Sequence, residues 1–500
     1  MKCALIIPAW TPEEIFPSRT ALSQVNYWQP LGTLYVAACL IEAGHEVKLF
    51  NGAFLSHREL LRRVDEFAPQ AAGIYATAFG WPGALKTAAD LKRAHAELFM
   101  CAGGPYPIAM QEQCLADCEA IDAVVTGEAE RTLVEVLERL ASGRALDGVP
   151  GVAFRQDGQI VKNAPRPLIE DLDALPFPAR ALLEGAERYL PPPATFRRAP
   201  VATLITSRGC DRRCLYCFQI DRERRAGRRG VRLRSVENVL QEIETCLAQG
   251  YREIKFLDDS FAADYERALQ ICGAIKARGL DFTWFASACA TQVDERLLTA
   301  MRGAGCWAIL IGAESGVQKN LNMLRKACTL EQIREAVRAA KSAGLQVSTP
   351  FVFGIPGETF AEGLQTIDFA LELDPDLANF HCLTPFPGTD LYDRGERYGT
   401  LSASLGDYTY QGAAFSPHTL TREEIQRLRQ LAFRRFYSRP AWLWRRLCGL
   451  RSRNDLAAAA RGLRSLFWLW AGEGLFARRQ TAASLTGAGT RARVPDKAAG

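Results

Sequence analysis

Three cysteines stand close together in the middle of the chain, at Cys210, Cys214 and Cys217. Their spacing, C-x3-C-x2-C, lets three thiolates wrap one face of an iron–sulfur cube and leaves one iron open for a further molecule. A zinc site is the alternative, but it would want a fourth Cys or His, and no second pair stands at a suitable spacing. An Asp or a distant Cys could still complete such a site. We therefore predict a [4Fe–4S] cluster with one open iron.

The cysteine loop follows directly after the first of six apolar runs that alternate with helical patterns. The runs cover 202–206, 253–257, 281–286, 308–312, 346–354 and 377–384, and the helical patterns cover 236–249, 265–278, 294–302, 330–342 and 360–372. Six such units predict a partial (β/α)6 barrel of the TIM type, with its chemistry at the carboxyl ends of the strands. The loop lies at that end, which further disfavours zinc.

An earlier α/β series fills the first part of the chain. Apolar runs at 3–7, 46–50, 71–76, 98–102 and 120–126 alternate with helical patterns such as 31–43 and 82–95. This alternation predicts a parallel sheet covered on both faces, a Rossmann-like (flavodoxin-like) domain whose ligand lies beyond the carboxyl ends of the strands. Two glycine-bearing segments, 103–105 and 127–130, occupy that edge. No G-x-G-x-x-G follows the first strand, so a dinucleotide site is disfavoured.

These patterns divide the chain into five parts. We expect the Rossmann-like domain at 1–145, a hairpin and proline-rich linker at 146–200, the barrel at 201–395, a helical substrate or lid region at 396–479, and a disordered tail rich in Gly, Ala and Thr at 480–500.

Bulk composition excludes several classes of protein. The net charge is +5 over 500 residues, which is too small to indicate a nucleic-acid-binding protein. No window is apolar enough to span a membrane, and the short apolar start does not resemble a signal peptide. Fifteen cysteines at mostly irregular spacings indicate reduced thiols rather than a disulfide framework. We therefore expect a cytoplasmic protein.

With its aromatic Tyr216 before the third cysteine, the loop resembles the signature of the radical S-adenosylmethionine (SAM) superfamily. The resemblance implies that SAM chelates the open iron and that Tyr216 packs beside the cluster and the adenine. It extends to Asp258 and Asp259, which end the second strand, and to Gly312, Glu314 and Ser315, which end the fourth. In the family, these positions face the site and bind SAM.

The order of domains is similar to that of the cobalamin-binding subclass of radical SAM enzymes. The resemblance implies a cobalamin site at Gly103, Gly104, Gly127 and Glu128. Two departures stand out. The D-x-H-x-x-G motif that supplies a cobalt-binding histidine elsewhere is absent, and His45 lies at the wrong end of the sheet, so we expect base-off cobalt without a histidine. Tyr106 stands where the family often has His.

The resemblance implies a C-methyltransferase that acts on an unactivated carbon through a 5′-deoxyadenosyl radical and methylcobalamin. An oxidative cyclase or rearrangement enzyme, similar to the porphyrin cyclases, is the alternative; a non-enzymatic cobalamin sensor is an alternative of another class. A methylthiotransferase is disfavoured because the N-terminal cysteines form no ligand triad. The chemistry needs no protein nucleophile, so no catalytic residue is assigned, although Glu358, Tyr408 and Tyr410 could face the substrate.

Partners follow from the same chemistry. We expect a small-molecule or lipid-like substrate and a flavodoxin- or ferredoxin-type electron donor. A basic run follows the cluster loop and is typical of a solvated loop, although Arg232 or Arg234 could meet an anionic group. The Trp- and Arg-rich stretch from 442 to 470 could lie on a membrane surface, but a helix pair packed on the barrel is favoured.

Overall fold

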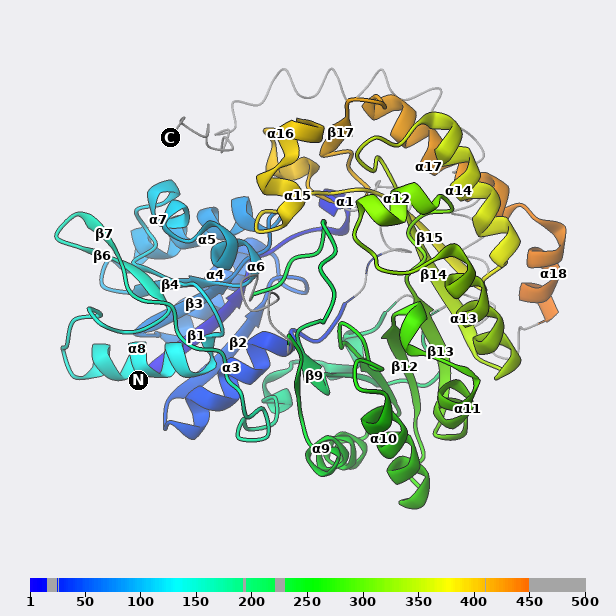
Figure 1. Cartoon of the computed structure of the whole chain (residues 1–500). Coiled ribbons are helices and arrows are strands. Elements are labelled where there is room, and N and C mark those ends of the chain that lie inside the picture. The colour runs from blue at the N-terminus through cyan, green and yellow to red at the C-terminus, as the bar shows by residue number, and fades with distance from the viewer. Residues whose placement is uncertain (16–24, 26, 192–194, 221–229, 410, 449–500) are drawn as a thin grey trace.

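The computed structural model describes residues 1–15, 25, 27–191, 195–220, 230–409 and 411–448. Figure 1 shows the first domain in blue and cyan on one side and the green barrel on the other, with the yellow segment around α15 and α16 lying across the top between them. The Arg222–Arg229 part of the basic run, Tyr410 and the tail after residue 448 lie outside the described residues.

The first domain is built on a seven-stranded sheet with the order β2-β1-β3-β4-β5-β6-β7. Its strands are β1 (Lys2–Ile7), β2 (Glu46–Asn51), β3 (Ala71–Tyr75), β4 (Phe99–Gly103), β5 (Ala123–Val125), β6 (Val152–Gln156) and β7 (Gln159–Lys162). The first five are parallel, and the last two add antiparallel pairs. The five predicted parallel strands are therefore confirmed.

The hairpin that the sequence placed in the linker extends this sheet instead. Asp157 and Gly158 have φ of 50° and 77°, the left-handed pair that a tight hairpin turn requires. Ala153 of β6 pairs with Val124 of β5. The sequence signals the turn but not the strand that the hairpin joins, because pairing across a sheet depends on contacts distant in the chain.

Alternation along β1 directs its side chains to two helical layers. Cys3 and Leu5 pack with helices α3 (Leu31–Glu42) and α8 (Ala129–Ala141), whereas Ala4 and Ile6 pack on the other face. The helices of that second layer are α4 (His57–Phe67), α5 (Trp81–Ala94), α6 (Pro105–Met110) and α7 (Glu112–Asp117). The short helix α1 (Pro12–Ile15) follows β1.

The second sheet has six parallel strands in the order β15-β14-β13-β12-β11-β8. They are β8 (Val201–Leu204), β11 (Glu253–Phe256), β12 (Thr283–Ala288), β13 (Cys306–Ile311), β14 (Gln346–Phe353) and β15 (Leu377–Cys382). The helices between them are α9 (Val236–Ala248), α10 (Tyr265–Ala277), α11 (Glu295–Gly303), α12 (Gln318–Met323), α13 (Leu330–Ser342) and α14 (Phe360–Leu373). All six predicted strands are confirmed, and a two-residue pair, β9 (Ser207–Arg208) with β10 (Arg232–Leu233), brackets the cluster loop.

The segment after β15 returns to the first domain. It contains α15 (Asp390–Asp393), α16 (Gly395–Tyr398) and the hairpin β16 (Gly399–Leu401) with β17 (Phe415–Pro417). Tyr392, Leu405 and Tyr408 are buried in the same core cluster as Trp81 and Tyr106 of the first domain.

Helix α17 (Arg422–Tyr437) then packs against α14 and β15, and α18 (Pro440–Cys448) follows it. Trp442 donates to the carbonyl oxygen of Asp376 at 3.0 Å, so this tryptophan packs on the barrel, as favoured. Trp444 is exposed. Over the described residues, no helix combines the length and apolarity needed to cross a membrane.

Candidate cofactor site between the two domains

A cavity of about 500 Å³ lies where the carboxyl ends of the first sheet face the cluster loop. The first domain contributes Gly103, Gly104, Gly127 and Glu128, which are the four residues predicted to bind cobalamin. The barrel side contributes Ser207, Arg208, Gly209, Phe218, Gln219, Ile220, Leu257 and Asp259. The fold therefore brings the four predicted cobalamin residues and Asp259, one of the predicted SAM residues, to the same cavity.

On the first-domain wall, the backbone conformation at position 104 requires a glycine. Its φ is 103°, and a Cβ there would lie 2.8 Å from the carbonyl oxygen of Ala76. A Cβ at the neighbouring Gly103 would meet no atom within 4 Å. The absence of side chains at this turn leaves room for a large flat ligand to approach the backbone.

Glu128 lies in a group of four charged residues that we call the Glu128 cluster: Glu128, Glu130, Arg208 and Arg232. The Glu128 carboxylate accepts from Arg208 and Arg232 at 2.9 Å and from the backbone N–H of Ile169 at 2.8 Å, and Glu130 accepts from Arg208 at 2.6 Å. Burial alone would raise the pKa of Glu128, but Arg232 and Arg208 hold it below its ordinary value. The carboxylate therefore ties the first domain to the base of the cluster loop.

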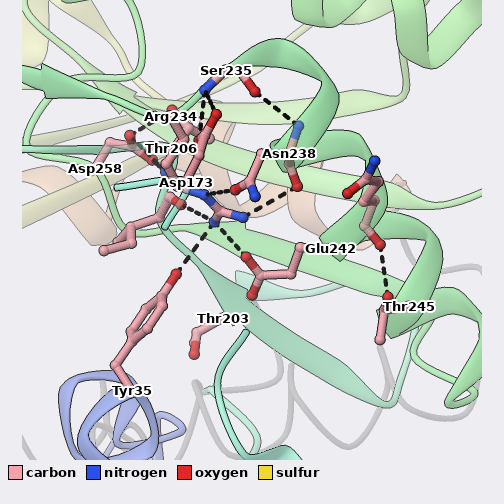
Figure 2. Close-up of polar contacts among 12 residues, drawn as sticks. Tyr35, Asp173, Thr203, Thr206, Arg234, Ser235, Asn238, Glu242, Thr245 and Asp258 are labelled. Carbon is pink, nitrogen blue, oxygen red and sulfur yellow. Dashed lines mark hydrogen bonds and ion pairs between the residues drawn. The ribbon is translucent and has the colours of Figure 1, made fainter. Parts of the chain in front are cut away.

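A second set of polar contacts holds the end of β8, just before the cysteines (Figure 2). Arg234 donates to the carbonyl oxygen of Ile205 at 2.7 Å and to the hydroxyl of Tyr35 at 3.3 Å, and it forms an ion pair with buried Glu242. Glu242 also pairs with Arg180 at 2.6 Å. The arginine therefore joins α3, the strand end and α9, and it is not available to an anionic substrate.

Asp258 belongs to the same set. Its carboxylate accepts from the N–H and hydroxyl of Thr206, the latter at 2.7 Å, and from the hydroxyl of Ser207 at 2.5 Å. Burial raises the pKa of Asp258, although these hydrogen bonds oppose the rise. Asp258 thus fixes the entry to the cluster loop, whereas the adjacent Asp259 lines the cavity.

The cysteine loop begins at a backbone contact that only glycine allows. Gly209 has φ of 89°, and a Cβ there would lie 2.0 Å from the carbonyl oxygen of Gly230. The three cysteines that follow are half-buried, and none is in a disulfide. Burial raises the pKa of the Cys210 thiol to about 12. A bound metal would supply the positive charge that thiolates need here.

The three thiols of the loop are a donor set that an iron–sulfur cluster can use. Among the residues that the structure describes, no three His, Cys, Asp or Glu side chains converge as they would around one metal ion. A four-iron cube is much larger than an ion, so its thiolates need not meet at one point. Three thiols outside any disulfide, on one short loop, suit such a cube.

At the end of β13, the lack of a side chain at Gly312 leaves space for a buried ion pair. The Glu314 carboxylate accepts from Lys326 at 2.7 Å, and a Cβ on Gly312 would lie 2.6 Å from both charged groups. Burial would lower the pKa of Lys326, but Glu314 and then the nearby Tyr216 and Cys214 raise it well above its ordinary value. Gly312, Glu314 and Tyr216 therefore gather beside the cluster loop.

Three other predicted polar groups point elsewhere. Ser315 is buried and contacts Thr366 at 3.1 Å, away from the cavity lining. Glu358 accepts from the N–H of Gly354 at 2.7 Å, and Tyr408 donates to the carbonyl oxygen of Ser402 at 3.0 Å. Neither Glu358 nor Tyr408 lines this cavity, and each holds a turn of its own segment.

Sequence reasoning missed Arg208 and Lys326, which make two of the charged contacts at the site. Arg208 precedes Cys210 by two residues and also stacks over the ring of Tyr35, with 5.1 Å between the guanidinium carbon and the ring centroid. Its position next to the cysteines in the sequence could have identified it as a site residue. Lys326 offered none, because it lies beyond α12 and far from any motif.

Comparison with known proteins matches both halves of this site. Residues 204–370 match the Radical SAM superfamily, and residues 20–137 match the B12 binding domain. An uncharacterised methyltransferase of Pyrococcus horikoshii is 33% identical over 446 residues, which cover 88% of this chain and 93% of the relative. The chain belongs to the radical SAM proteins that carry an N-terminal B12-binding domain.

Two further likenesses place this radical SAM protein among its relatives. The anaerobic magnesium-protoporphyrin IX monomethyl ester cyclase of Rubrivivax gelatinosus is 27% identical over 83% of this chain and 75% of its own length. The cobalamin-dependent radical enzyme OxsB, solved with aqua-cobalamin and SAM, shares the fold with a TM-score of 0.70 at 17% identity, over 93% of this chain and 71% of that one. The [4Fe–4S] cluster, SAM and cobalamin are the cofactors of this family.

Proposed function

We propose that this radical SAM protein is a cobalamin-dependent C-methyltransferase that acts on an unactivated carbon of a small molecule. The observation that carries the proposal is the shared cavity. It is lined on one side by the glycine-bearing strand ends of the B12-binding domain and on the other by residues 207–209 and 218–220, which flank the three cysteines. Its Pyrococcus relative, a methyltransferase, supports the reaction type.

We assign cofactor residues from this geometry. Cys210, Cys214 and Cys217 would hold the cluster. Tyr216, Asp259, Gly312 and Glu314 would form the SAM side, with Asp258 and Ser315 keeping the strand ends in place. The backbone at Gly103, Gly104, Gly127 and Glu128 would meet the corrin, because the Glu128 carboxylate is already paired.

When bound, the cofactors supply a 5′-deoxyadenosyl radical and a transferable methyl group. The protein's own part is to hold the two reacting groups against one substrate and to exclude water. None of the described residues that line the cavity is a histidine, and His45 contacts the N-terminal amine at the opposite end of the sheet. We therefore propose cobalt without a histidine ligand.

Partners and location complete the proposal. Reductive cleavage of SAM at the open iron needs one electron at a time. We propose that a reduced flavodoxin- or ferredoxin-type protein supplies these electrons. All fifteen cysteines are free, which suits the reducing cytoplasm. We retain the domain limits at 145, 200 and 395, with β6 and β7 structurally part of the first sheet.

A second candidate is an oxidative cyclase or rearrangement enzyme with the same cofactors, favoured by the likeness to the porphyrin-ester cyclase. Product mass separates the two. Methylation adds one methylene unit to the substrate, whereas cyclisation leaves the mass unchanged or lowers it by hydrogen loss.

The test is anaerobic reconstitution of the full chain with iron, sulfide and hydroxocobalamin. We expect a cluster signal in visible and EPR spectra, stoichiometric corrinoid and reductive cleavage of SAM to 5′-deoxyadenosine. A protein that binds corrinoid but never cleaves SAM would support the sensor alternative. Failure to bind corrinoid would refute the assignment of the first domain.

A further inference from the structure

Apolar side chains are exposed on the barrel side of the cofactor cavity, and the proposed function gives them no role. Among the described residues, five large apolar side chains are exposed, and two of these, Ile220 and Leu257, line this cavity. Ile220 is 44% exposed and Leu257 is 40% exposed, and the half-buried Phe218 also lines the cavity. Exposed apolar groups that gather in a cavity mark a surface that a ligand covers.

Leu257 lies where the cavity meets the inside of the barrel. Ile254 and Phe256 of β11 belong to the same core cluster as residues of α9 and α10. Alternation along the strand therefore turns Lys255 and Leu257 toward the barrel interior. The N–H of Leu257 donates to the carbonyl oxygen of Leu204 at 2.8 Å, which continues the pairing of β11 with β8. A ligand that contacts Leu257 in the cavity is therefore also at the inner face of the barrel.

The inner face of the barrel offers neutral polar groups to such a ligand. Burial alternates along β12 and β15, where the residues that face the helices are buried. Ser287, Asn379 and His381 face inward and are only half-buried, so they can form hydrogen bonds with a substrate. Lys255 is buried on this face, and its ammonium nitrogen lies 3.4 Å from a carboxylate oxygen of buried Glu253. This lysine is therefore not available to an anionic group.

The charges around the cavity would repel an anionic ligand. The described residues that line it carry two positive and three negative charges, on Arg208, Arg232, Glu128, Glu130 and Asp259. Both arginines already form ion pairs with the two glutamates, at 2.6 to 2.9 Å. The lining as a whole therefore has a net negative charge. An anionic group would lose its water here without gaining a positively charged partner from these residues.

We propose that the substrate is a largely apolar molecule with no anionic group in the part that enters this cavity, and that Leu257 is a specificity-determining residue for it. The proposal rests on the proposed function, since it names the class of substrate for that same site. Apolar surface of the substrate would cover Ile220 and Leu257. Its neutral polar groups would reach Ser287, Asn379 or His381 inside the barrel.

Equilibrium dialysis with two probes of the same shape tests the class of substrate. The full chain is reconstituted with its cluster, hydroxocobalamin and SAM, and the cluster is kept oxidised so that SAM is not cleaved. It is then dialysed against 2-naphthamide, which is neutral, or 2-naphthoate, which is anionic. We expect the amide to bind roughly tenfold more tightly, because the carboxylate would be buried without a partner.

Two outcomes of the dialysis would overturn the proposal. One is equal or tighter binding of the carboxylate, which would mean that the cavity accepts an anion. The other is failure of both probes to bind, because the cofactors alone would then cover the apolar side chains.

Variants of Leu257 give a second measurement. Leu257→Ala should weaken amide binding roughly fivefold, because part of the apolar contact area is lost. Leu257→Lys should bring the affinity for the carboxylate closer to that for the amide, since it adds a positive charge to the lining. Ile160→Lys is the matched control and should keep both affinities, since Ile160 is 37% exposed on β7 and does not line the cavity.

Unchanged amide binding in Leu257→Ala, or equal effects of Leu257→Lys and Ile160→Lys, would overturn the role of Leu257. If Leu257→Lys does not fold, the nearly isosteric Leu257→Asn decides, since it should weaken amide binding as much as Leu257→Ala. If the wild type binds no cluster or no corrinoid, the proposed function fails instead, and the two failures are therefore distinguishable.

Discussion

The two walls of the cofactor cavity are lined by different kinds of residue. The first-domain wall combines glycines, such as Gly103 and Gly104, with apolar side chains, such as Leu31, Val36 and Leu133. The barrel wall presents charged side chains, including Arg208 and Asp259, next to the loop that carries the three cysteines. Shape therefore defines the first wall and charge the second, so substitutions on the two walls should fail in different ways.

The largest effect should come from the barrel wall. Cys214→Ala removes one of three cluster ligands, so we expect loss of the cluster signal and of 5′-deoxyadenosine formation, with corrinoid binding retained. Cys118→Ala, a half-buried cysteine of the first domain, is the control and should keep both. Persistent SAM cleavage in Cys214→Ala would refute the cluster assignment.

The next effect tests the link between the walls. Glu128→Gln leaves Arg232 without its carboxylate and leaves Arg208 with Glu130 alone, which should lower the free energy of unfolding by about 3 kcal/mol. It should also raise the ratio of 5′-deoxyadenosine formed to product formed, because the corrin and the cluster lose their common anchor. Glu184→Gln, which breaks an exposed pair with Arg63, should change neither quantity measurably. Equal denaturation curves for Glu128→Gln and wild type would refute this role.

The buried Glu358 should make the free energy of unfolding depend on pH, with an effect of similar or smaller size. Burial raises its pKa from the ordinary 4.5 to about 7, so the folded state prefers the neutral acid. Its stabilising contribution is complete below the unfolded pKa and is lost as the pH rises through about 7. Against Glu358→Gln, the wild type should lose up to about 3 kcal/mol between about pH 5 and about pH 8. A pH-independent difference in urea denaturation would contradict the raised pKa.

The smallest effect should come from the glycine wall, where two neighbours form a matched pair. Gly104→Ala places a side chain at a positive φ and too near the Ala76 carbonyl, which should cost about 2 kcal/mol. Gly103→Ala meets no neighbouring atom and should leave the melting temperature nearly unchanged. If both variants melt alike, the backbone does not define this wall.

The sequence predicted the repeating part of the molecule well, for a physical reason. Eleven parallel strands were recognisable because buried parallel strands form short apolar runs between helices, which is a local signal. The cysteine loop was equally local. The pairing of hairpin β6–β7 with β5 could not be predicted in this way, because nothing in the hairpin sequence identifies its partner strand.

The direction of polar side chains was the weaker part of the prediction. Asp258 and Asp259 are adjacent and chemically alike, yet one holds Thr206 and Ser207 while the other lines the cavity. Strand alternation sends neighbours to opposite faces, but the register at a strand end cannot be read from a motif. The pairing of Glu128 with arginines some 80 and 104 residues away was likewise invisible before folding.

The return of the segment around α15 and β17 has a consequence for how the chain is made. Trp81 and Tyr106 leave the ribosome before Tyr392, Leu405 and Tyr408, which complete their cluster and are synthesised hundreds of residues later. The aromatic side chains of Trp81 and Tyr106 in the nascent first domain therefore stay partly uncovered until the barrel and the segment after it have emerged. A truncation after the linker would leave that face permanently uncovered, so the core of the B12-binding domain depends on a segment that follows the barrel.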